Sequence, residues 1–562
     1  MIDLHVHSSH SDGTFSPTEL VEEASKKKLT AFALTDHDTV AGIAEAVFAA
    51  GRADPPIEVI PGIEFSTNYG EVDVHVLGYG IDYCSDEFRK VIAEFVDTRE
   101  TRNKEMCRRL VNDGIDVPYE SLLEENPGAV ITRANIARYM ADHGIVKDMP
   151  EAFSRYIGEG CPYYVPRTKM SPEDAVRTIL RFGGVPVLAH PYQYGLGSAE
   201  LSVLLDRMTE AGLMGLECLY SKYTVREREE LLKLAGERKL LVTGGSDFHG
   251  SNKPCLELGT GYEDRPLAVP EKLLTGLKRA LFGTSENTKL FFFDLDGTLL
   301  DDGKKITPDT FAALERISGA GHRIILCSGR PLSNVLKVHD ELGLNRLGGT
   351  AVIGCNGAEA FDCGTGRTLF KEGLSLETVR KVFALADRFG VHVQTYRRDA
   401  VVCRRECPET EYYQRYVRMN FLTAEDPVSL LDEEPGKCLA IDLDGKSARL
   451  SLLRQALADE LGEQADACLS NPYYLEIISR RAGKGRAVTR TAGLLGVPCE
   501  NTIAAGDSGN DISMLEAAGI SIAMCNGTAL TPELTGAAHF ITSKDNSHDG
   551  LVPFLDYLGL PV

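Results

Sequence analysis

Histidine and aspartate are concentrated at the start of the chain. The stretch DLHVHSSHSDG is far richer in these residues than 13 histidines in 562 residues would predict. It contains His5, His7, His10, Asp3 and Asp12. Side chains of an extended segment alternate between two faces, so the imidazoles of His5 and His7 point the same way. Imidazoles with nearby carboxylates are groups that bind divalent transition metals.

Similar groups recur farther along the first half of the chain. Six of the eight histidines before residue 284 lie within or directly after an apolar, strand-like run: His5, His7, His37, His75, His190 and His249. Three acids occupy equivalent places: Asp12, Glu64 and Asp247. Strand ends converge on one face of parallel α/β folds, so we expect these nine side chains to meet there.

Nine such ligands exceed what one metal ion needs. Two or three ions of Mn, Fe or Zn that share a bridging carboxylate would use them. Clustered metals bind phosphate and lower the pKa of water toward about 7, which favours hydrolysis of phosphate esters.

A second set of reactive groups begins with FFFDLDGTLL, where Asp294 and Asp296 follow a hydrophobic strand. Later segments add LCSGRP, GKG and AAGDSGNDISML, which supply Ser328, Lys484, Asp507 and Asp511. Together these segments predict a phosphoryl-transfer site. Oxygen ligands favour Mg²⁺, for which we expect Asp294, Asp296, Asp507 and Asp511 as ligands.

Each of these residues has an expected role in that chemistry. Asp294 would attack phosphorus and form an aspartyl phosphate, while Asp296 protonates the leaving oxygen and later activates water. Ser328 would donate a hydrogen bond to the phosphate, and Lys484 would offset its negative charge.

Alternating apolar runs and helix-like stretches must position both sets of residues. They predict an α/β barrel or doubly wound sheet in residues 1–283, with a charged helical insertion at about 86–182. The polar segment 284–289 reads as a linker. The alternation restarts in a second α/β domain, 290–562. A cap at about 372–477 is inserted into this domain, and its core consists of 290–371 and 478–562.

Bulk composition narrows the possible functions. A formal net charge of -22 argues against binding long nucleic acid through a basic surface, but leaves small phosphorylated substrates open. The 14 cysteines include no CxxC pair, and we find neither a signal peptide nor a membrane-spanning apolar stretch. We therefore expect a cytoplasmic protein with no membrane partner.

The first half resembles the polymerase and histidinol phosphatase (PHP) family. DLHVHSSHSDG, TDHDT, GIEFS, VHVLGY, AHP and SDFHG match its motifs in order. The resemblance implies a distorted seven-stranded barrel with up to three metals. It assigns His5, His7, Glu64 and Asp247 to one metal, Glu64, His75 and His190 to a second, and Asp12, His37 and His249 to a third.

Within that family, the insertion resembles the branch of nucleoside 3',5'-bisphosphate phosphatases and 5' to 3' exoribonucleases. Its arginines Arg99, Arg102 and Arg133 are candidate substrate ligands, because guanidinium groups bind phosphate in a bidentate manner. Arg133 lies inside the matching stretch and is our preferred candidate.

The second half resembles the Cof-like phosphatases of the haloacid dehalogenase (HAD) superfamily, through DLDGT, SGRP, GKG and GDSGND. The resemblance implies a Rossmann-like core with an inserted α/β cap that sets substrate preference. It also implies substrate contacts from Asn356, Gly357 and Asn510. Ser328 stands where threonine is common and retains the hydroxyl.

These observations predict a bifunctional phosphatase that acts on small phosphorylated substrates such as nucleotides or sugar phosphates. The barrel would hydrolyse nucleoside 3',5'-bisphosphates, and the second site could then remove the remaining phosphate. One alternative is a barrel that acts as an exoribonuclease on short RNA. Another is a metal-stabilised barrel that is not catalytic and serves as a scaffold or regulator of the attached phosphatase.

Overall fold

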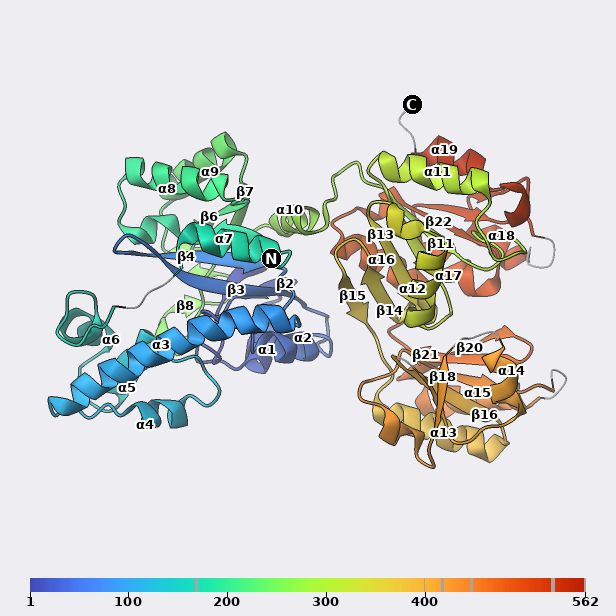
Figure 1. The fold of residues 1–562 in the computed structure, drawn as a ribbon, viewed down its shortest axis with the longest axis horizontal. Coiled ribbons are helices and arrows are strands. Elements are labelled where there is room, and N and C mark those ends of the chain that lie inside the picture. The colour runs from blue at the N-terminus through green and yellow to red at the C-terminus, as the bar shows by residue number, and fades with distance from the viewer. Residues whose placement is uncertain (167–169, 399, 416–418, 445–447, 527–530, 560–562) are drawn as a thin grey trace. The chain divides into compact units, whose positions relative to one another are not determined.

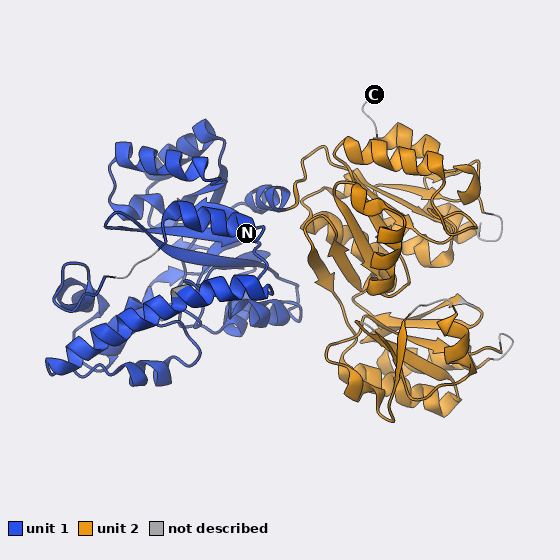
Figure 2. Ribbon diagram, in the orientation of Figure 1, with its two compact units in different colours: residues 1–281 blue, residues 282–562 orange. Residues whose placement is uncertain are grey.

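A computed structural model describes the chain except for residues 167–169, 399, 416–418, 445–447, 527–530 and 560–562. The parts of the expected insertion, cap and carboxyl-terminal core that fall there lie outside the described residues. The chain forms two compact units, Met1–Leu281 and Phe282–Val562 (Figure 2). Each unit has its own sheets and its own hydrophobic clusters.

Unit 1 is built on a seven-stranded sheet in which the strands follow their order in the sequence (Figure 1). The strands are β1 (Ile2–Val6), β2 (Ala31–Leu34), β3 (Glu58–Tyr69), β4 (Val72–Tyr79), β5 (Val185–Leu188), β6 (Gly215–Tyr220) and β7 (Leu241–Gly245). Helices α1 (Pro17–Lys26), α2 (Ile43–Ala50), α8 (Ser198–Glu210) and α9 (Val225–Arg238) connect parallel neighbours. This α/β organisation confirms the fold class expected for the first half.

One strand departs from the parallel pattern. β3 and β4 form a hairpin, so β4 runs antiparallel to both β3 and β5. The hairpin turns at Gly70 and Glu71, between the paired residues Tyr69 and Val72. A residue near the start of β4 therefore reaches the same rim as residues at the ends of the parallel strands.

The sheet curves until its first and last strands meet. The amide of Asp247 donates to the carbonyl of His5 at 2.8 Å, and the amide of His7 donates to the carbonyl of Phe248 at 3.0 Å. A Cβ atom on Gly245 would lie 2.4 Å from the backbone nitrogen of His5, so only glycine permits this approach. The ends of β1 and β7 are thereby joined where the metal-ligand candidates lie.

The insertion of unit 1 forms a helical layer beside the barrel (Figure 1). It begins with the long α3 (Asp86–Asn112) and continues through α4 (Tyr119–Glu125), α5 (Arg133–Asp142), α6 (Met149–Ala152) and a π-helical turn (Phe153–Ile157). These elements share a cluster that includes Met106, Leu122 and Ile136. The next helix, α7 (Pro172–Arg181), instead packs its Val176 and Ile179 against the barrel strands and belongs to the wall.

Unit 2 contains an eight-stranded core sheet in the order β15-β14-β13-β12-β11-β22-β23-β24. Its strands are β11 (Leu290–Asp294), β12 (Arg323–Cys327), β13 (Thr350–Gly354), β14 (Glu359–Asp362), β15 (Arg367–Lys371), β22 (Thr502–Gly506), β23 (Ile520–Ala523) and β24 (Phe540–Ile541). The core is parallel from β13 to β24 and is covered by α11 (Pro308–Gly319), α12 (Leu332–Glu341), α16 (Lys484–Leu494), α17 (Ile512–Ala517), α18 (Pro532–Ala537) and α19 (Val552–Gly559). This is the Rossmann-like arrangement expected for the second half.

A second sheet is inserted between β15 and α16. It has the order β18-β17-β16-β19-β21-β20 and packs against α13 (Leu376–Phe389) and α15 (Arg449–Leu461). Its strands are β16 (His392–Arg397), β17 (Ala400–Cys403), β18 (Asn420–Thr423), β19 (Lys437–Ile441), β20 (Ala465–Asn471) and β21 (Tyr474–Ser479). In the part of the chain that the structure describes, we find no helix with the length and apolar character needed to cross a membrane.

Candidate active sites

Glu64 is the centre of the site in unit 1. It lies in the middle of β3 and is fully buried. Five imidazole nitrogens lie between 2.9 and 3.2 Å from its two carboxylate oxygens. They belong to His5, His7, His37, His75 and His190. The sheet thus brings together five histidines that are spread from residue 5 to residue 190 of the sequence.

The two oxygens of Glu64 face different histidines. Oε1 is 2.9 Å from Nδ1 of His75 and 3.0 Å from Nε2 of His190. Oε2 faces the other three rings, including Nε2 of His7 at 3.1 Å. A carboxylate divided in this way has the arrangement needed to bridge two metal ions.

A second carboxylate, Asp247, lies beside the rings of His5 and His7. Its Oδ1 is 3.6 Å from Nε2 of His5 and 3.4 Å from Nε2 of His7. One ligand atom from each of these three residues and from Glu64 lies within 4.8 Å of the others.

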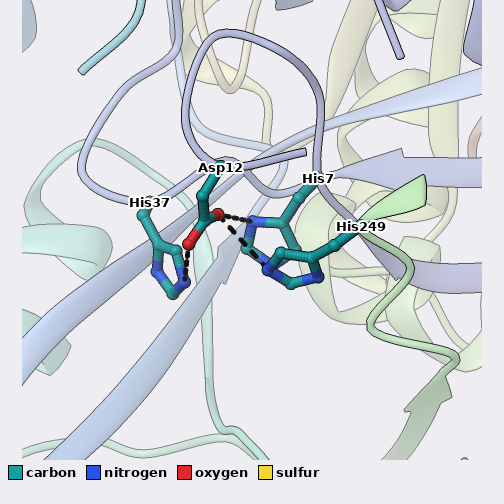
Figure 3. A group of neighbouring side chains, drawn as sticks. All are labelled: His7, Asp12, His37 and His249. Atoms are coloured by element: carbon teal, nitrogen blue, oxygen red, sulfur yellow. Dashed lines mark ion pairs between the residues drawn. The ribbon is translucent and has the colours of Figure 1, made fainter. Parts of the chain in front are cut away.

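The third carboxylate, Asp12, belongs to the loop after β1 and faces His7, His37 and His249 (Figure 3). Its Oδ1 is 3.3 Å from Nε2 of His249 and 3.9 Å from Nδ1 of His7. Its Oδ2 is 3.9 Å from Nε2 of His37. All nine side chains expected from the sequence therefore lie at one rim of the sheet, and His7, His37 and Glu64 each take part in two of the groups.

The donor atoms at this rim fit metal ions. Within the described part of the chain, several of the buried atoms have no hydrogen-bond partner: His5 Nε2, both ring nitrogens of His7, Asp12 Oδ1, His37 Nδ1, Glu64 Oε2 and His190 Nδ1. Buried polar atoms without partners are costly, and a metal ion is one way to satisfy them. His5 Nε2, His7 Nε2 and His37 Nδ1 all face Oε2 of Glu64, so this donor set suits divalent cations.

Electrostatics show how closely these groups are coupled. Burial alone would raise the pKa of Glu64, but the surrounding imidazoles, His37 and His5 first, hold it well below its ordinary range. Burial lowers the pKa of His37 to about 3, so its ring is neutral and able to bind a metal. Although burial opposes it, the carboxylates of Glu217 and Glu64 raise the pKa of His5.

Sequence reasoning missed several residues that support these ligands. Glu217 on β6 lies 3.0 Å from Nδ1 of His5 and accepts a 2.8 Å hydrogen bond from the amide of His190. Tyr220, on the same strand, donates to Oδ2 of Asp247 at 2.7 Å. The signal for Glu217 was available, because a charged residue inside the apolar run GLECLY needs a partner when it is buried.

The two acids that flank His37 hold neighbouring segments in place. Asp36 accepts hydrogen bonds from the amide and hydroxyl of Ser8, at 2.7 and 2.6 Å, and from the hydroxyl of Ser11 at 2.6 Å. Asp38 accepts from the amide of Ser66 at 2.9 Å. These contacts fix the loop after β1 and the end of β3 relative to each other.

The three arginines proposed as substrate ligands occupy different environments. Arg99 is buried and pairs with Asp38, and it also donates to the hydroxyl of Ser66 at 2.9 Å. Arg102 is also buried. Arg133 starts α5 and lies 3.3 Å from Asp73, which in turn is 3.5 Å from His75. Arg133 is thus close to the metal-ligand candidates, and all three substrate roles stay predictions.

The site in unit 2 is organised by a buried lysine. Lys484, at the first position of α16, donates to Oδ1 of Asp294 and to Oδ1 of Asp511, both at 2.6 Å. Ligand atoms of Asp294, Asp507 and Asp511 lie within 4.8 Å of one another. Asp294 ends β11, and Asp507 and Asp511 follow β22, the adjacent strand of the core sheet. Three carboxylates in one place fit a Mg²⁺ ion.

Burial and mutual repulsion set the protonation of these acids. Burial, with the carboxylates of Asp511 and Asp507, raises the pKa of Asp294 to about 8 despite the nearby ammonium of Lys484. Burial and Asp511 raise the pKa of Asp507 to about 6. The site therefore carries more negative charge than Lys484 alone neutralises, as a cation site requires.

The carboxylate of Asp296 faces two cationic side chains. Arg330 lies 2.8 and 2.9 Å from its two oxygens, and Lys304 lies 2.8 Å from Oδ1. These two cations hold the pKa of Asp296 below its ordinary value although burial opposes them. This geometry gives no support to a metal-binding carboxylate at Asp296, whereas a role in proton transfer stays open.

The remaining candidates of unit 2 come from loops at the same edge of the core sheet. Ser328 follows β12, and its carbonyl accepts from the amide of Asn356 at 3.1 Å. A Cβ atom on Gly357 would lie 2.4 Å from the backbone of Gly483, next to Lys484, so glycine is required there. Asn510 lies in a short 3-10 turn, where its Oδ1 accepts from the hydroxyl of Ser508.

Comparison with known proteins identifies a family for each half of the chain. A PHP-domain model matches residues 3–125, and a model described as haloacid dehalogenase-like hydrolase matches residues 291–555. The chain therefore belongs to the PHP family in its first half and to the haloacid dehalogenase-like hydrolase family in its second half, as the motifs predicted. It is an enzyme that hydrolyses phosphoric esters.

Individual relatives correspond to one half or the other. The chain is 33% identical over 271 residues to a 3',5'-nucleoside bisphosphate phosphatase of Chromobacterium violaceum, covering 48% of this chain and 94% of that protein. It is 35% identical over 274 residues to a 5'-3' exoribonuclease of Haemophilus influenzae, covering 48% and 98%. It is 31% identical over 266 residues to the putative phosphatase YxeH of Bacillus subtilis, covering 46% and 94%.

Proposed function

We propose that the protein is a bifunctional phosphatase. Its barrel would remove a phosphate from nucleoside 3',5'-bisphosphates, and its second unit would hydrolyse a phosphomonoester through an aspartyl phosphate. The observation that carries the first part is Glu64, a buried carboxylate with five histidine nitrogens within 3.2 Å of its oxygens. Buried polar atoms in a purely structural core are normally hydrogen-bonded, so a cluster of ring nitrogens and carboxylate oxygens without such partners indicates a ligand site.

In the barrel, metal ions held by the nine ligand candidates would polarise the phosphate and lower the pKa of a water molecule. We propose Mn, Fe or Zn, because imidazole and carboxylate together suit these ions. The chain's own contribution is positional. Glu64 holds the histidines around one point, Asp247 and Asp12 extend the site to both sides, and the adjacent insertion brings Arg133 near His75.

In the second unit, Asp294 would attack phosphorus and the ester bond to the leaving oxygen would break. Asp296 gives that oxygen a proton, and in the second step it takes a proton from the water that attacks the aspartyl phosphate and frees Asp294. Lys484 keeps its proton and offsets the charge of Asp294 throughout. Mg²⁺ held by Asp294, Asp507 and Asp511 would neutralise the charge on the phosphate.

The name of a relative supports nucleoside 3',5'-bisphosphates as the substrate class of the barrel. A protein named as a 3',5'-nucleoside bisphosphate phosphatase matches over almost its whole length. A small anionic substrate also agrees with the net charge of -22, which disfavours long nucleic acids.

One panel experiment tests both halves. Purified wild type, Asp294→Asn and the His5→Ala/His7→Ala double variant are assayed with nucleoside bisphosphates, nucleoside monophosphates and sugar phosphates, in Mn²⁺ and in Mg²⁺. We expect the double variant to lose bisphosphate hydrolysis and Asp294→Asn to keep it. Monoester hydrolysis by the second unit should show the reverse pattern.

Two results would contradict the proposal. Loss of bisphosphate hydrolysis in Asp294→Asn, with retention in the double variant, would place that reaction in the second unit. If the double variant changes only thermal stability and no metal-dependent activity, the barrel is a scaffold or regulator rather than an enzyme.

A second candidate for the barrel is a 5' to 3' exoribonuclease that acts on short RNA. A relative with that name matches at 35% identity. The two candidates are separated by comparing a mononucleoside 3',5'-bisphosphate with a 5'-phosphorylated RNA of five nucleotides. A higher kcat/KM for the RNA would favour the exoribonuclease.

A further inference from the structure

A cavity of about 180 Å³ opens at the rim of the barrel, where the metal-ligand candidates lie. It is lined by His37, Glu64, His75, His190, Gln193, Tyr220, Asp247, His249 and Lys253. Among these described lining residues, Lys253 alone carries a permanent positive charge. A phosphate ester bound in this cavity would therefore lie in a pocket that Lys253 lines with its ammonium group.

The loop that carries Lys253 is fixed to the loop that carries Asp12. The side-chain amide of Asn252 donates to the carbonyl of Asp12 at 2.6 Å, and the amide of Ser251 donates to the hydroxyl of Thr14 at 2.9 Å. Lys253 therefore follows a segment tied at two points to the site. Such preorganisation is typical of residues that bind a reacting group.

The ammonium group of Lys253 has three hydrogens to donate. It contacts the carbonyl of Asp247 at 3.2 Å and also Oδ2 of the same residue. Within the described chain these are its two hydrogen-bond partners, which leaves one donor for a ligand. Oδ1 of Asp247 faces His5, His7 and His249. The carboxylate of Asp247 therefore links the ammonium group of Lys253 to the metal-ligand candidates.

The arginines nearest the site are already engaged. Arg99 pairs with Asp38 and Ser66, and Arg133 pairs with Asp73. Neither is among the described residues that line the cavity. Lys253 is therefore better placed than either arginine to contact the phosphoryl group at the metal centre.

We propose that Lys253 binds the phosphoryl group that the barrel removes and offsets its negative charge during the reaction. The proposal rests on the proposed function of the barrel and adds a substrate-binding residue to it. Lys253 keeps its proton and neither makes nor breaks a covalent bond. Because it contacts the reacting phosphate, it serves every substrate of the barrel, whether or not that substrate carries a second phosphate.

The test measures phosphate binding directly. Mn²⁺-loaded, full-length Asp294→Asn protein is titrated with inorganic phosphate by calorimetry, with and without Lys253→Met. The contribution of the second unit is common to both proteins, so the difference reports on the barrel. A charge-assisted hydrogen bond of this kind predicts that the barrel's affinity for phosphate falls about 10- to 100-fold. Lys253→Arg should restore part of it.

Lys27→Met is the matched control, because Lys27 also pairs with a carboxylate, that of Glu257, outside the cavity. It should leave phosphate affinity unchanged. Metal content and circular dichroism are measured for each variant. Unchanged phosphate affinity in Lys253→Met would overturn the proposal, and so would a fall in affinity that matches a loss of bound metal, because Lys253 would then act only by positioning Asp247.

Kinetics separate this proposal from the proposed function. If wild type hydrolyses nucleoside bisphosphates, Lys253→Met should lower kcat/KM for bisphosphates and for 4-nitrophenyl phosphate by similar factors. If wild type hydrolyses no bisphosphate, the proposed substrate is wrong, while the phosphate titration still decides the role of Lys253.

Discussion

Oε1 of Glu217 lies 3.0 Å from Nδ1 of His5, and both side chains are fully buried. The other oxygen of Glu217 accepts the backbone amide of His190 at 2.8 Å. One carboxylate thus fixes two metal-ligand candidates, one on β1 and one in the segment after β5. With Nδ1 engaged by Glu217, Nε2 of His5 is left to face Glu64 and Asp247.

Glu217 should therefore tune metal binding without touching the metal. Carboxylates behind ligating histidines typically contribute 10- to 100-fold to metal affinity or activity. We expect Glu217→Ala to lower Mn²⁺ affinity of the barrel by about that factor, and Glu217→Gln, which can still accept a hydrogen bond, to lower it less. Metal content after dialysis against graded chelator measures the effect. Glu237→Gln, an exposed change on α9, is the control.

Lys484 should be essential to both the activity and the stability of unit 2. It is buried and donates to two carboxylates, so Lys484→Met leaves Asp294 and Asp511 without their shared cation. Removing one partner of a buried ion pair destabilises by about 3–5 kcal/mol. Denaturant unfolding without metal should show a loss of this order, part of which Mg²⁺ recovers. Stability equal to wild type would contradict the view that Lys484 balances this site.

The pH profile of unit 2 should depend on Lys304. This lysine and Arg330 lower the pKa of Asp296, so Lys304→Met removes a stabilising cation and moves that pKa upward. As an acid, Asp296 must be protonated, and it would then keep its proton up to a higher pH. As a base, it must be ionised, and it would then lose its proton only at a higher pH. Both limbs of the kcat/KM profile should therefore shift to higher pH. Lys305→Met is the control, and a shift of equal size in that variant would count against the assignment.

The stability of the cap should fall in mild acid because of His392. Burial lowers the pKa of this ring below its ordinary value of 6.5, and its Nδ1 lies 3.3 Å from Sγ of Cys407. The unfolded chain binds a proton more readily than the folded cap. The stabilising contribution is therefore present above about pH 6.5 and is lost as the pH falls below it. Unfolding midpoints of wild type should drop more between pH 7 and pH 5 than those of His392→Gln.

If the two sites act in sequence on one substrate, wild type and Asp294→Asn should form different products. Wild type incubated with adenosine 3',5'-bisphosphate would form adenosine, whereas Asp294→Asn would stop at the monophosphate. Chromatography of the products distinguishes the two. Accumulation of the monophosphate with wild type would mean that unit 2 acts on another class of phosphate ester.

Local sequence patterns carried most of the information about fold and chemistry. Alternating apolar residues around His5 and His7, and the strand that ends at Asp294, indicated which side chains leave a strand at its reactive edge. The α/β class of both halves and both families are confirmed. These features follow from short segments, because strand periodicity and the polar residues after a strand are encoded within about ten neighbouring positions.

The tertiary structure decided what those patterns could not. His75 reaches the rim because β4 runs antiparallel, a reversal that the apolar runs of the sequence did not indicate. Packing of the insertion pairs Arg99 with Asp38, while a loop tied to Asp12 places Lys253 in the cavity. Glu217 meets His5 across 212 residues. Such pairings depend on how distant strands and loops pack together, and a charged residue's partner is set by that packing rather than by its neighbours in sequence.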